Sequence, residues 1–495
     1  MTALSSSVFR RSALAAAIAA STLLGACAVG PDYRRPDVAM TAASFKEAGA
    51  DWHPAAPNDA IDRGAWWELF GDAQLDALAQ QVAVSNQNVA AAVAAYEQAR
   101  ALVREERASL FPTVELDASA TRSGSKSSDS SVVTGSTVSQ GGSVSNSYAG
   151  GIDASWAPDI WGSLRRSVEN ARASAQASAA DLAAARLSAQ GELVTDYLSL
   201  READAEIALQ QGTVDGYQRS LTIAENRYKA GIAPRTDVLS AQTQLYTAQA
   251  TLEGLRQTRA TYEHAIAVLV GQAPADFSIA PAQWNAVVPD VPLLLPSTLL
   301  QRRPDIAAAE REVAAANASV GVAQAAWFPS LSLSGSYGSS TSHFKDLFDG
   351  SSLLWSLGAS ATETLLDFGA RKAQVAQARA AYDAAVANYR EVTLEAFQDV
   401  EDQLTATRVL EKQYALRQQA SDVADENERQ ILNQYKAGQI TFSDVVTAQA
   451  SAASARSELI ETALSRQTTA VALIQALGGG WHADDADAGD SGKKD

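Results

Sequence analysis

Residues 227–242 read RYKAGIAPRTDVLSAQ, and residues 434–449 read QYKAGQITFSDVVTAQ. The two stretches align without a gap, so each residue of the first has a counterpart 207 positions later. Identical residues fall at matching positions, among them Tyr228/Tyr435, Gly231/Gly438, Asp237/Asp444 and Gln242/Gln449. Self-similarity at a fixed spacing indicates that one structural unit occurs twice in the chain.

The repeat extends well upstream of these stretches. The same offset of 207 aligns Trp161-Gly162 with Phe368-Gly369, whereas Phe111-Pro112 aligns with Phe328-Pro329 at an offset of 217. The change in offset falls between these blocks, where the first copy has the longer Ser/Gly-rich loop. The sequence therefore predicts two tandem copies that differ mainly in this loop.

Both copies predict the same order of elements. A helix, about 73–109 or 303–326, is broken by Phe-Pro, since proline cannot continue a helix. Two runs with alternating apolar residues then enclose a Ser/Gly-rich loop, which is the pattern of a β-hairpin. The hairpins are expected at 113–157 and 330–366, with loops at 121–147 and 338–351.

A very long helix is predicted after each hairpin. The expected ranges are 163–229 and 370–436, and at 1.5 Å per residue each forms a rod of roughly 100 Å. Helices of this length without breakers are typical of coiled-coil packing. A Lys-Ala-Gly turn ends each rod, and Gly231 and Gly438 suit the left-handed position after a helix. Shorter helices, about 236–270 and 443–477, then return.

The first residues of the chain predict an export signal. Arg10 and Arg11 precede a short apolar run that ends in Leu-Gly-Ala-Cys at 24–27, which resembles a bacterial lipoprotein box. Cys27, the only cysteine, is expected to carry the lipid after removal of residues 1–26, and Ala28 after it favours the outer membrane. The alternative is an ordinary signal peptide with a chance cysteine.

The rest of the chain divides around the repeats. The expected parts are a lipid-anchored extended segment at 27–72, repeat 1 at 73–270, a linker at 271–302, repeat 2 at 303–478, and an acidic disordered tail at 479–495.

Composition narrows the function. A formal net charge of −18 argues against a nucleic-acid partner, and four histidines with one cysteine make a protein-built metal site improbable. The chain has no HExxH, Walker A or GxSxG motif, so no enzyme activity is expected. After the signal, no run of 18 apolar residues predicts a membrane-spanning helix.

Four strands with one apolar face suit a membrane barrel but cannot close one, and open sheet edges are not tolerated in lipid. Strands from several copies must therefore combine, and three copies supply twelve. The alternative reading is a pair of ordinary soluble hairpins on a coiled-coil protein.

The chain resembles the outer-membrane efflux protein family, the TolC-like channels, and within it the NodT/OprM-like lipoprotein branch of resistance–nodulation–division efflux systems. The resemblance covers nearly the whole mature chain. It rests on the two Phe-Pro junctions, the two YKAG turns and three longer motifs: CAVGPDYRRP at 27–36, WWELFGDAQLDAL at 66–78 and LLQRRPDIAAAE at 299–310.

The resemblance implies an α+β membrane protein that forms a homotrimer in the bacterial outer membrane. Four transmembrane strands per protomer would build a twelve-stranded β-barrel that continues into a periplasmic α-barrel of long coiled-coil helices. The trimer would be a passive exit channel for drugs or other small molecules, as in multidrug resistance. A periplasmic adaptor protein would join it to an inner-membrane pump of the resistance–nodulation–division class. The palmitate-bearing lipid on Cys27 is the only bound group expected, with no metal or other cofactor.

The resemblance also implies a periplasmic gate near the YKAG turns. Asp444 and Asp237 match acidic gate positions, and Tyr435 matches a tyrosine that ties the closed state by hydrogen bonding. Ile440 and Thr447 depart from the pattern, since some members carry an arginine and an aspartate there. Without the resemblance, both aspartates are equally explained as first-turn residues that favour helix starts.

The hairpin ends have two readings as well. Five residues are expected to dock the adaptor: Tyr228, Lys229, Gly231, Lys436 and Gly438. They also fit plain helix-hairpin turns. For the whole protein, the alternatives are the exit duct of a type I protein secretion system, and a pore-less lipid-anchored coiled-coil scaffold.

Overall fold

The computed structural model describes residues 28–37, 45–47, 65–125, 143–291 and 303–481. The elements in chain order are η2 (Trp66–Phe70), α2 (Ala73–Ser85), α3 (Gln87–Ala108), β1 (Thr113–Ser125), β2 (Ser143–Trp156), α4 (Ser163–Lys229), α5 (Arg235–Leu269), η3 (Pro274–Asp276), α7 (Pro304–Ala325), β3 (Ser330–Thr341), η4 (Phe344–Asp346), η5 (Gly350–Ser352), β4 (Leu353–Thr362), α8 (Ala370–Lys436) and α9 (Phe442–Ala476).

These elements form two compact units. The first, here called the sheet unit, comprises residues 1–35, 98–175 and 312–386. The second, the helical unit, comprises residues 36–97, 176–311 and 387–495. Each unit therefore combines parts of both sequence repeats, and neither repeat is a compact unit alone.

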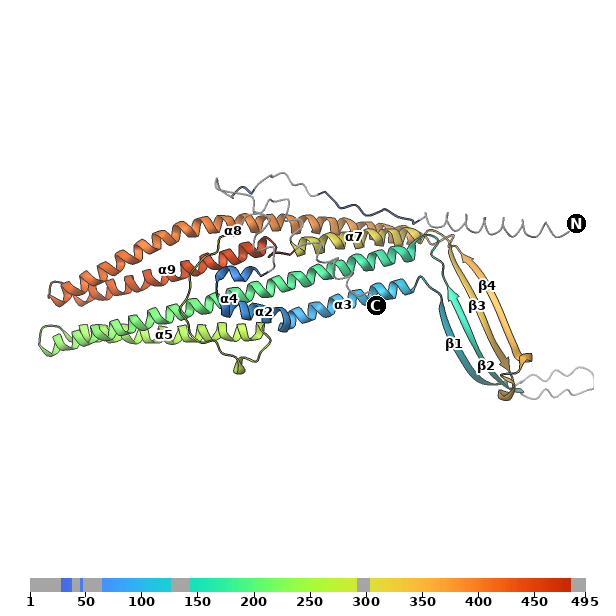
Figure 1. Cartoon of the computed structure of the whole chain (residues 1–495), viewed down its shortest axis with the longest axis horizontal. Coiled ribbons are helices and arrows are strands. Elements are labelled where there is room, and N and C mark those ends of the chain that lie inside the picture. Colours follow the sequence, from blue (N-terminus) through green and yellow to red (C-terminus); the bar gives the residue numbers. More distant parts are fainter. Residues whose placement is uncertain (1–27, 38–44, 48–64, 126–142, 292–302, 482–495) are drawn as a thin grey trace, which may run out of the picture. The chain divides into compact units, whose positions relative to one another are not determined.

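The four strands form one antiparallel sheet in the order β1-β2-β3-β4 (Figure 1). The predicted hairpins are confirmed, but the loops expected at 121–147 and 338–351 are shorter than predicted, because β1 continues to Ser125, β2 starts at Ser143 and β3 continues to Thr341. The two hairpins share one register. Thr113 lies opposite Ser155 in the first hairpin, and their counterparts Ser330 and Thr362 lie opposite each other in the second. The offsets of 217 and 207 read from the sequence therefore hold residue by residue in the sheet.

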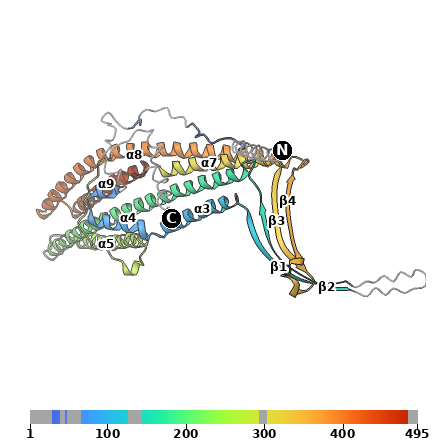
Figure 2. The same ribbon diagram turned by 45° about the vertical axis from the view of Figure 1, so that its right-hand side comes forward.

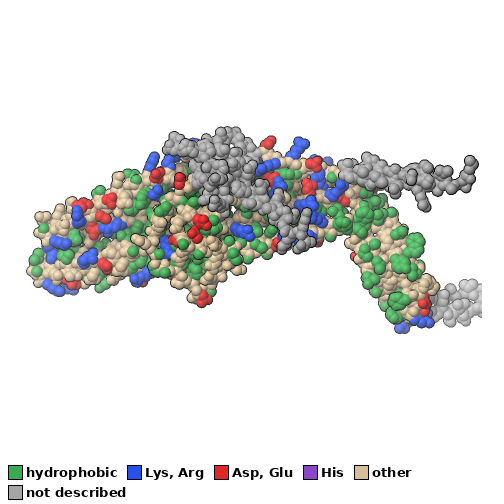
Figure 3. Space-filling model, in the orientation of Figure 1, with side chains coloured by type: hydrophobic (Ala, Val, Ile, Leu, Met, Phe, Trp, Pro, Cys, Tyr) green, Lys and Arg blue, Asp and Glu red, His purple; other side chains and the backbone are tan. Residues whose placement is uncertain are grey.

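The two faces of this sheet differ sharply. One face carries Val114, Leu116, Ile152, Trp156, Leu333, Tyr337, Trp355 and Leu357, several of them paired across strands and most of them exposed. The other face carries serines joined across strands, with Oγ–Oγ distances of 2.8 Å for Ser332–Ser360 and Ser336–Ser356. Patches of hydrophobic side chains lie over the strands in the space-filling view (Figure 3). An exposed apolar face of this size marks a surface that is covered by lipid or protein.

The long helices α4 and α8 have the predicted bounds and 67 residues each. In the helical unit, α5 returns along α4 and α9 returns along α8, so each repeat ends in a helical hairpin (Figures 1 and 2). One cluster of buried residues, including Tyr217, Leu221, Leu245, Tyr435 and Val445, joins all four helices near the hairpin ends. This shared apolar cluster holds the two hairpins of one protomer together.

The prediction of one helix over 73–109 is wrong, because the chain breaks at Asn86 between α2 and α3. The side-chain Oδ1 of Asn86 accepts hydrogen bonds from the backbone N–H groups of Asn88 (2.9 Å) and Val89 (3.1 Å), which starts α3. Its Nδ2 donates to the carbonyl oxygen of Leu269 at 3.0 Å. Asn86 thus ends one helix, caps the next and fixes both to the end of α5.

The motif WWELFGDAQLDAL forms η2 and the start of α2 and supplies the core of the helical unit. Trp66 and Leu75 are fully buried in the same cluster as Leu193 and Tyr197 of α4. Asp72 caps α2 through the Gln74 and Leu75 N–H groups and accepts a hydrogen bond of 2.6 Å from the Tyr197 hydroxyl. The motif therefore packs η2 and the start of α2 against α4.

Several predictions fall outside the described residues. These are the signal at 1–26, the lipidated Cys27, most of the tail, and parts of the first hairpin loop and of the linker. Among the residues that the structure describes, no helix is both long enough and apolar enough to cross a membrane.

Candidate functional site

The ends of the two helical hairpins are the candidate gate, and the same turn closes each. The N–H of Ile232 donates to the Arg227 carbonyl oxygen at 2.9 Å, and that of Gln439 donates to the Gln434 carbonyl oxygen at 3.0 Å. These bonds span a glycine in the left-handed region, with φ of 72° at Gly231 and 73° at Gly438. The predicted left-handed glycines are confirmed, and each lets the chain reverse without a Cβ clash.

The residues expected at the tips lie at the surface. Tyr228, Lys229, Gly231, Lys436 and Gly438 are all exposed. Their positions leave them available to a partner, while their backbone geometry is that of plain helix-hairpin turns. Both readings of the tips therefore stay open on the geometry of one protomer.

The two equivalent tyrosines have opposite environments. Tyr228 is 47% exposed, whereas Tyr435 is 2% exposed and packs against Phe442 with ring centroids 5.3 Å apart. The counterpart of Phe442 in the first repeat is Arg235, which cannot supply the same apolar wall. The second hairpin thus encloses its tyrosine and the first does not.

Arg227 connects the two hairpin ends. Its guanidinium carbon lies 4.6 Å from the centroid of the Tyr435 ring, and its Nη1 donates to the Tyr435 carbonyl oxygen at 2.8 Å. We call Arg227, Tyr435 and Phe442 the hairpin-end contact. Sequence reasoning did not single out Arg227, although the repeat alignment marks it, because its counterpart is the uncharged Gln434.

The Tyr435 hydroxyl is buried and makes no hydrogen bond with any described residue. Burial raises the pKa of Tyr435, and the nearby Asp237 carboxylate raises it further. Asp237 therefore faces this hydroxyl without the geometry of a hydrogen bond.

Asp444 has a structural role within the protomer. Its Oδ2 accepts hydrogen bonds from the backbone N–H of Thr441 at 3.0 Å and from the Thr441 hydroxyl at 2.7 Å. Asp444 is nevertheless exposed and Asp237 is half-exposed, so both carboxylates reach solvent at the hairpin ends. These hydrogen bonds support the interpretation of Asp444 as a helix-start residue. The gate role of Asp444 stays a prediction about the assembled channel.

The two departures from the gate pattern add no charge here. Ile440 packs against the apolar cluster that joins the hairpins. The Thr447 hydroxyl donates to the Ser443 carbonyl oxygen of its own helix at 3.0 Å. The carboxylates at 237 and 444 are therefore not offset by charges at these two positions.

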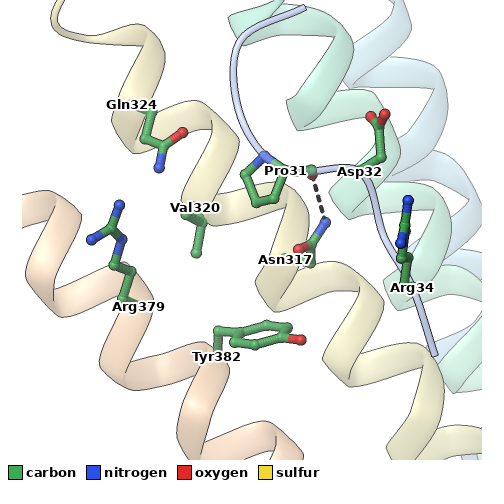
Figure 4. Close-up of a pocket in the computed structure, with 8 residues that line it drawn as sticks. All are labelled: Pro31, Asp32, Arg34, Asn317, Val320, Gln324, Arg379 and Tyr382. Atoms are coloured by element: carbon green, nitrogen blue, oxygen red, sulfur yellow. Dashed lines mark hydrogen bonds between the residues drawn. The ribbon is translucent and has the colours of Figure 1, made fainter. Parts of the chain in front are cut away.

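A second feature is the docking of residues 28–34 in the sheet unit. Arg166 of α4 donates to the carbonyl oxygens of Val29 and Gly30 and forms an ion pair of 2.9 Å with Asp32. The Asn317 side chain of α7 donates to the Pro31 carbonyl oxygen at 2.9 Å (Figure 4). This segment follows Cys27 directly, so the chain next to the predicted lipid site is fixed.

The docking depends on glycine. Gly30 has φ of 108°, and a Cβ there would lie 2.5 Å from the Cα of Gly321. Beside the segment, a cavity of about 460 Å³ opens between α7 and α8 (Figure 4). Its lining residues are Pro31, Asp32, Arg34, Asn317, Val320, Gln324, Arg379 and Tyr382.

Aromatic residues gather where the strands meet the helices. Trp161 stacks on Phe328 with centroids 4.8 Å apart and an interplanar angle of 23°, and its Nε1 donates to the Pro329 carbonyl oxygen at 2.7 Å. The Trp156 Nε1 donates to the Leu110 carbonyl oxygen at 3.0 Å. Indole rings with a satisfied N–H beside an apolar sheet face are typical of a membrane–water interface.

In the part of the chain that the structure describes, no three His, Cys, Asp or Glu side chains are placed to hold a metal ion. The described residues instead give a two-faced sheet in the sheet unit and, in the helical unit, two helical hairpins with carboxylates at their ends.

Comparison with known proteins bears on these features. The family model "Outer membrane efflux protein" matches residues 78–272 and 295–479. The chain is 32% identical over 462 residues to the outer membrane protein OprJ of Pseudomonas aeruginosa, which covers 92% of this chain and 94% of OprJ. It is 30% identical over 470 residues to the pyoverdine export outer membrane protein OpmQ of the same organism, covering 94% of this chain and 97% of OpmQ.

A solved structure of the outer-membrane channel OprN is similar over 92% of this chain and 100% of that chain. The TM-score is 0.82 and the sequence identity is 29%.

Proposed function

Because this chain belongs to the outer membrane efflux protein family, we propose that it is the outer-membrane exit channel of a tripartite efflux pump. Its cargo class is drugs or other small molecules, which leave passively while an inner-membrane pump supplies the energy. The observation that carries the proposal is the sheet, which is apolar on one face, polar on the other and open at both edges.

The sheet explains why one copy is not enough. β1 and β4 each present one unpaired edge, and lipid cannot satisfy the backbone groups exposed there. Three copies supply twelve strands and close a barrel with its apolar face toward lipid and its serine-lined face toward a water-filled lumen. The α-helices of the three protomers continue this lumen as a periplasmic α-barrel.

The hairpin ends supply the gate and the docking surface of the proposed channel. Three copies bring six carboxylates, from Asp237 and Asp444, around one axis. Like charges held close together favour cations and resist full ionisation. The exposed tips at Tyr228, Lys229 and Lys436 meet the periplasmic adaptor, which connects them to an inner-membrane pump of the resistance–nodulation–division class.

The lipid on Cys27 is a second anchor in this proposal. Its support is the fixed position of residues 28–32, held by Arg166 and Asn317 close to the aromatic residues of the strand–helix junction. Labelling cells with radioactive palmitate tests this anchor. We expect label in the unaltered chain and none in Cys27→Ser, and equal labelling of both would contradict it.

The names of the similar proteins favour small-molecule efflux over protein secretion. OpmQ is described as a pyoverdine exporter, and the OprJ and OprN matches extend over nearly all of this chain. No feature of the described residues favours the type I secretion reading or a scaffold without a pore.

Single-channel recording in planar bilayers tests both the channel and its gate. The purified protein should give discrete conductance steps with a preference for cations. Asp237→Asn with Asp444→Asn should weaken that preference and enlarge the steps, whereas Asp215→Asn, on α4 away from the turn, should not. Absence of steps despite verified insertion would contradict the channel. Unchanged selectivity in the double variant would remove the gate role alone.

A further inference from the structure

The cavity beside residues 28–34 has no role in the proposed passage of cargo. All of its lining residues belong to the sheet unit, and its volume is about 460 Å³. Cavities of roughly 300–1,000 Å³ are typical of small-molecule binding sites. The side chains that line this cavity indicate which class of ligand it fits.

Two arginines stand on opposite sides of the cavity (Figure 4). Arg379 comes from α8, and Arg34 comes from the segment that follows Cys27. Both side chains are exposed, and neither guanidinium forms an ion pair or hydrogen bond with a residue that the structure describes. A guanidinium presents its N–H donors as a planar fork, which matches the oxygens of a phosphate group. The cavity therefore has two phosphate-binding groups with their donors available.

The remaining polar groups of the lining limit the charge of the ligand. Asp32 is the one acidic residue among the lining residues, and Arg166 binds its carboxylate at 2.9 Å. Two guanidinium groups and one carboxylate give the lining a formal charge of +1, within a chain whose net charge is −18. A group with one negative charge complements this lining better than a dianion does. Gln324 and Tyr382 add an amide and a hydroxyl that can donate to further oxygens.

The wall that carries Arg34 is fixed in place. Arg166 donates to the carbonyl oxygens of Val29 and Gly30, and the Asn317 amide, 5% exposed, donates to that of Pro31 at 2.9 Å. Between the two arginines, the buried Val320 and the ring of Tyr382 give the cavity an apolar part. A fixed polar wall beside an apolar surface suits a ligand that has an anionic group attached to carbon chains.

The position of the cavity along α7 points to a lipid. Gln324 lies four residues before Phe328, about 6 Å of helix, and Phe328 stacks on Trp161 where the strands meet the helices. In the proposed channel these rings mark the edge of the hydrocarbon, and the headgroups occupy the next 5–7 Å or so on each side. The cavity thus begins at the depth of the lipid phosphates. Arg34 also lies seven residues after Cys27, whose proposed lipid is on the outside of the channel.

We infer that this cavity binds the phosphodiester of a phospholipid headgroup from the periplasmic leaflet of the outer membrane. Arg34 and Arg379 hold the phosphate from two sides, and Gln324 and Tyr382 donate to its other oxygens. A phosphodiester carries one negative charge, as the lining requires, and basic pockets between helices at a membrane surface recognise such headgroups. The inference rests on the proposed outer-membrane channel and adds a lipid ligand to it.

Native mass spectrometry of the full-length protein in detergent tests the site, with dioleoyl phosphatidylglycerol as the probe. Dioleoylglycerol, which has the same acyl chains and no phosphate, is the matched control lipid. Arg34→Ala and Arg379→Ala should each lower the retained phosphatidylglycerol about tenfold or more, because each removes a charge-assisted hydrogen bond. Arg172→Ala is the matched control variant, since Arg172 is the exposed counterpart of Arg379 in the first repeat and does not line the cavity.

A second variant keeps both arginines. Gln324→Glu preserves the size of the side chain but places a carboxylate in the cavity, and it should lower the retained phosphatidylglycerol as the arginine variants do. Inorganic phosphate in large excess separates the two sources of phosphate. It should leave the lipid in place, and displacement of the lipid would overturn the lipid assignment in favour of a site for free phosphate.

The remaining outcomes separate the lipid site from the channel. Equal retention of phosphatidylglycerol by the Arg379→Ala and Arg172→Ala variants, or equal retention of the two lipids by the unaltered protein, would overturn the site. The channel would still stand if the same spectra show a trimer and the protein gives conductance steps. A monomer that gives no steps, yet retains phosphatidylglycerol through Arg34 and Arg379, would keep the site and contradict the channel.

Discussion

Replacing Arg227 by Gln, the residue at the equivalent position of the second repeat, should loosen the hairpin-end contact. The substitution removes the cation over the Tyr435 ring, at 4.6 Å, and the charged donor to the Tyr435 carbonyl oxygen, at 2.8 Å. That carbonyl oxygen also accepts the Gly438 N–H at 2.9 Å, so it does not become a buried acceptor without a partner. The loss is therefore that of these two interactions, together with a longer hydrogen bond of 3.4 Å from the same Nη1 to the Lys436 carbonyl oxygen.

A hydrogen bond from a charged donor contributes about 1.5–3 kcal/mol, and a cation–π contact at a partly exposed site about 0.5–1 kcal/mol. Because Arg227 is half-exposed, the low ends of both ranges apply, and their sum is about 2 kcal/mol per protomer. This corresponds to roughly a 30-fold change in the equilibrium between joined and separated hairpin ends.

In the proposed channel, separation of the hairpin ends would widen the periplasmic mouth, so single-channel recording would measure this change as open probability. Arg227→Gln should raise the open probability, and Arg235→Gln, which removes an equal charge from the same tip without touching Tyr435, should not. If Arg227→Gln channels behave as the unaltered protein does while remaining trimeric, the hairpin-end contact does not restrain opening.

Three further outcomes follow from particular contacts. Burial and neighbouring carboxylates raise the pKa of Glu202 from 4.5 to about 7. Between these pH values the folded state retains a proton that the unfolded state loses, so the free energy of unfolding falls as pH rises. Glu202→Gln should therefore remove about 2 kcal/mol of this pH dependence, measured as the difference in thermal midpoint between pH 5 and pH 8. Asn86→Ala should destabilise the helical unit by about 2–3 kcal/mol, because it removes a helix cap and a buried hydrogen bond to Leu269. Circular dichroism should then show the loss of helix at a lower temperature on heating. Gly30→Ala should displace residues 28–32 from Gly321, because the added Cβ would overlap its Cα. Trypsin should then cleave faster after Arg34, and unchanged cleavage would show that the segment tolerates the change.

Much of the fold could be predicted because it is specified locally. The bounds of α4 and α8 follow from uninterrupted helical periodicity that ends at a glycine. The hairpins follow from apolar alternation. Because the chain contains a repeat, the elements predicted for one copy also predict those of the other copy. These signals need no knowledge of distant contacts.

The parts that escaped prediction depend on distant residues. The break at Asn86 requires a partner 183 positions away, at Leu269, and nothing nearby in the sequence forbids a continuous helix. Arg227 gains its role from Tyr435, 208 positions away, on the other hairpin. The YKAG turns are identical in sequence, yet Tyr228 is exposed and Tyr435 is buried, because Phe442 stands where the first repeat has Arg235.

Single-particle electron microscopy of the purified protein in lipid nanodiscs tests the central claim most directly, since it shows the number of copies and the strand pairing together. We predict three copies, a closed barrel of twelve strands in the lipid, β4 of each protomer paired with β1 of the next, and six helical hairpins. A monomer, or an assembly in which the edges of β1 and β4 remain unpaired, would contradict the channel.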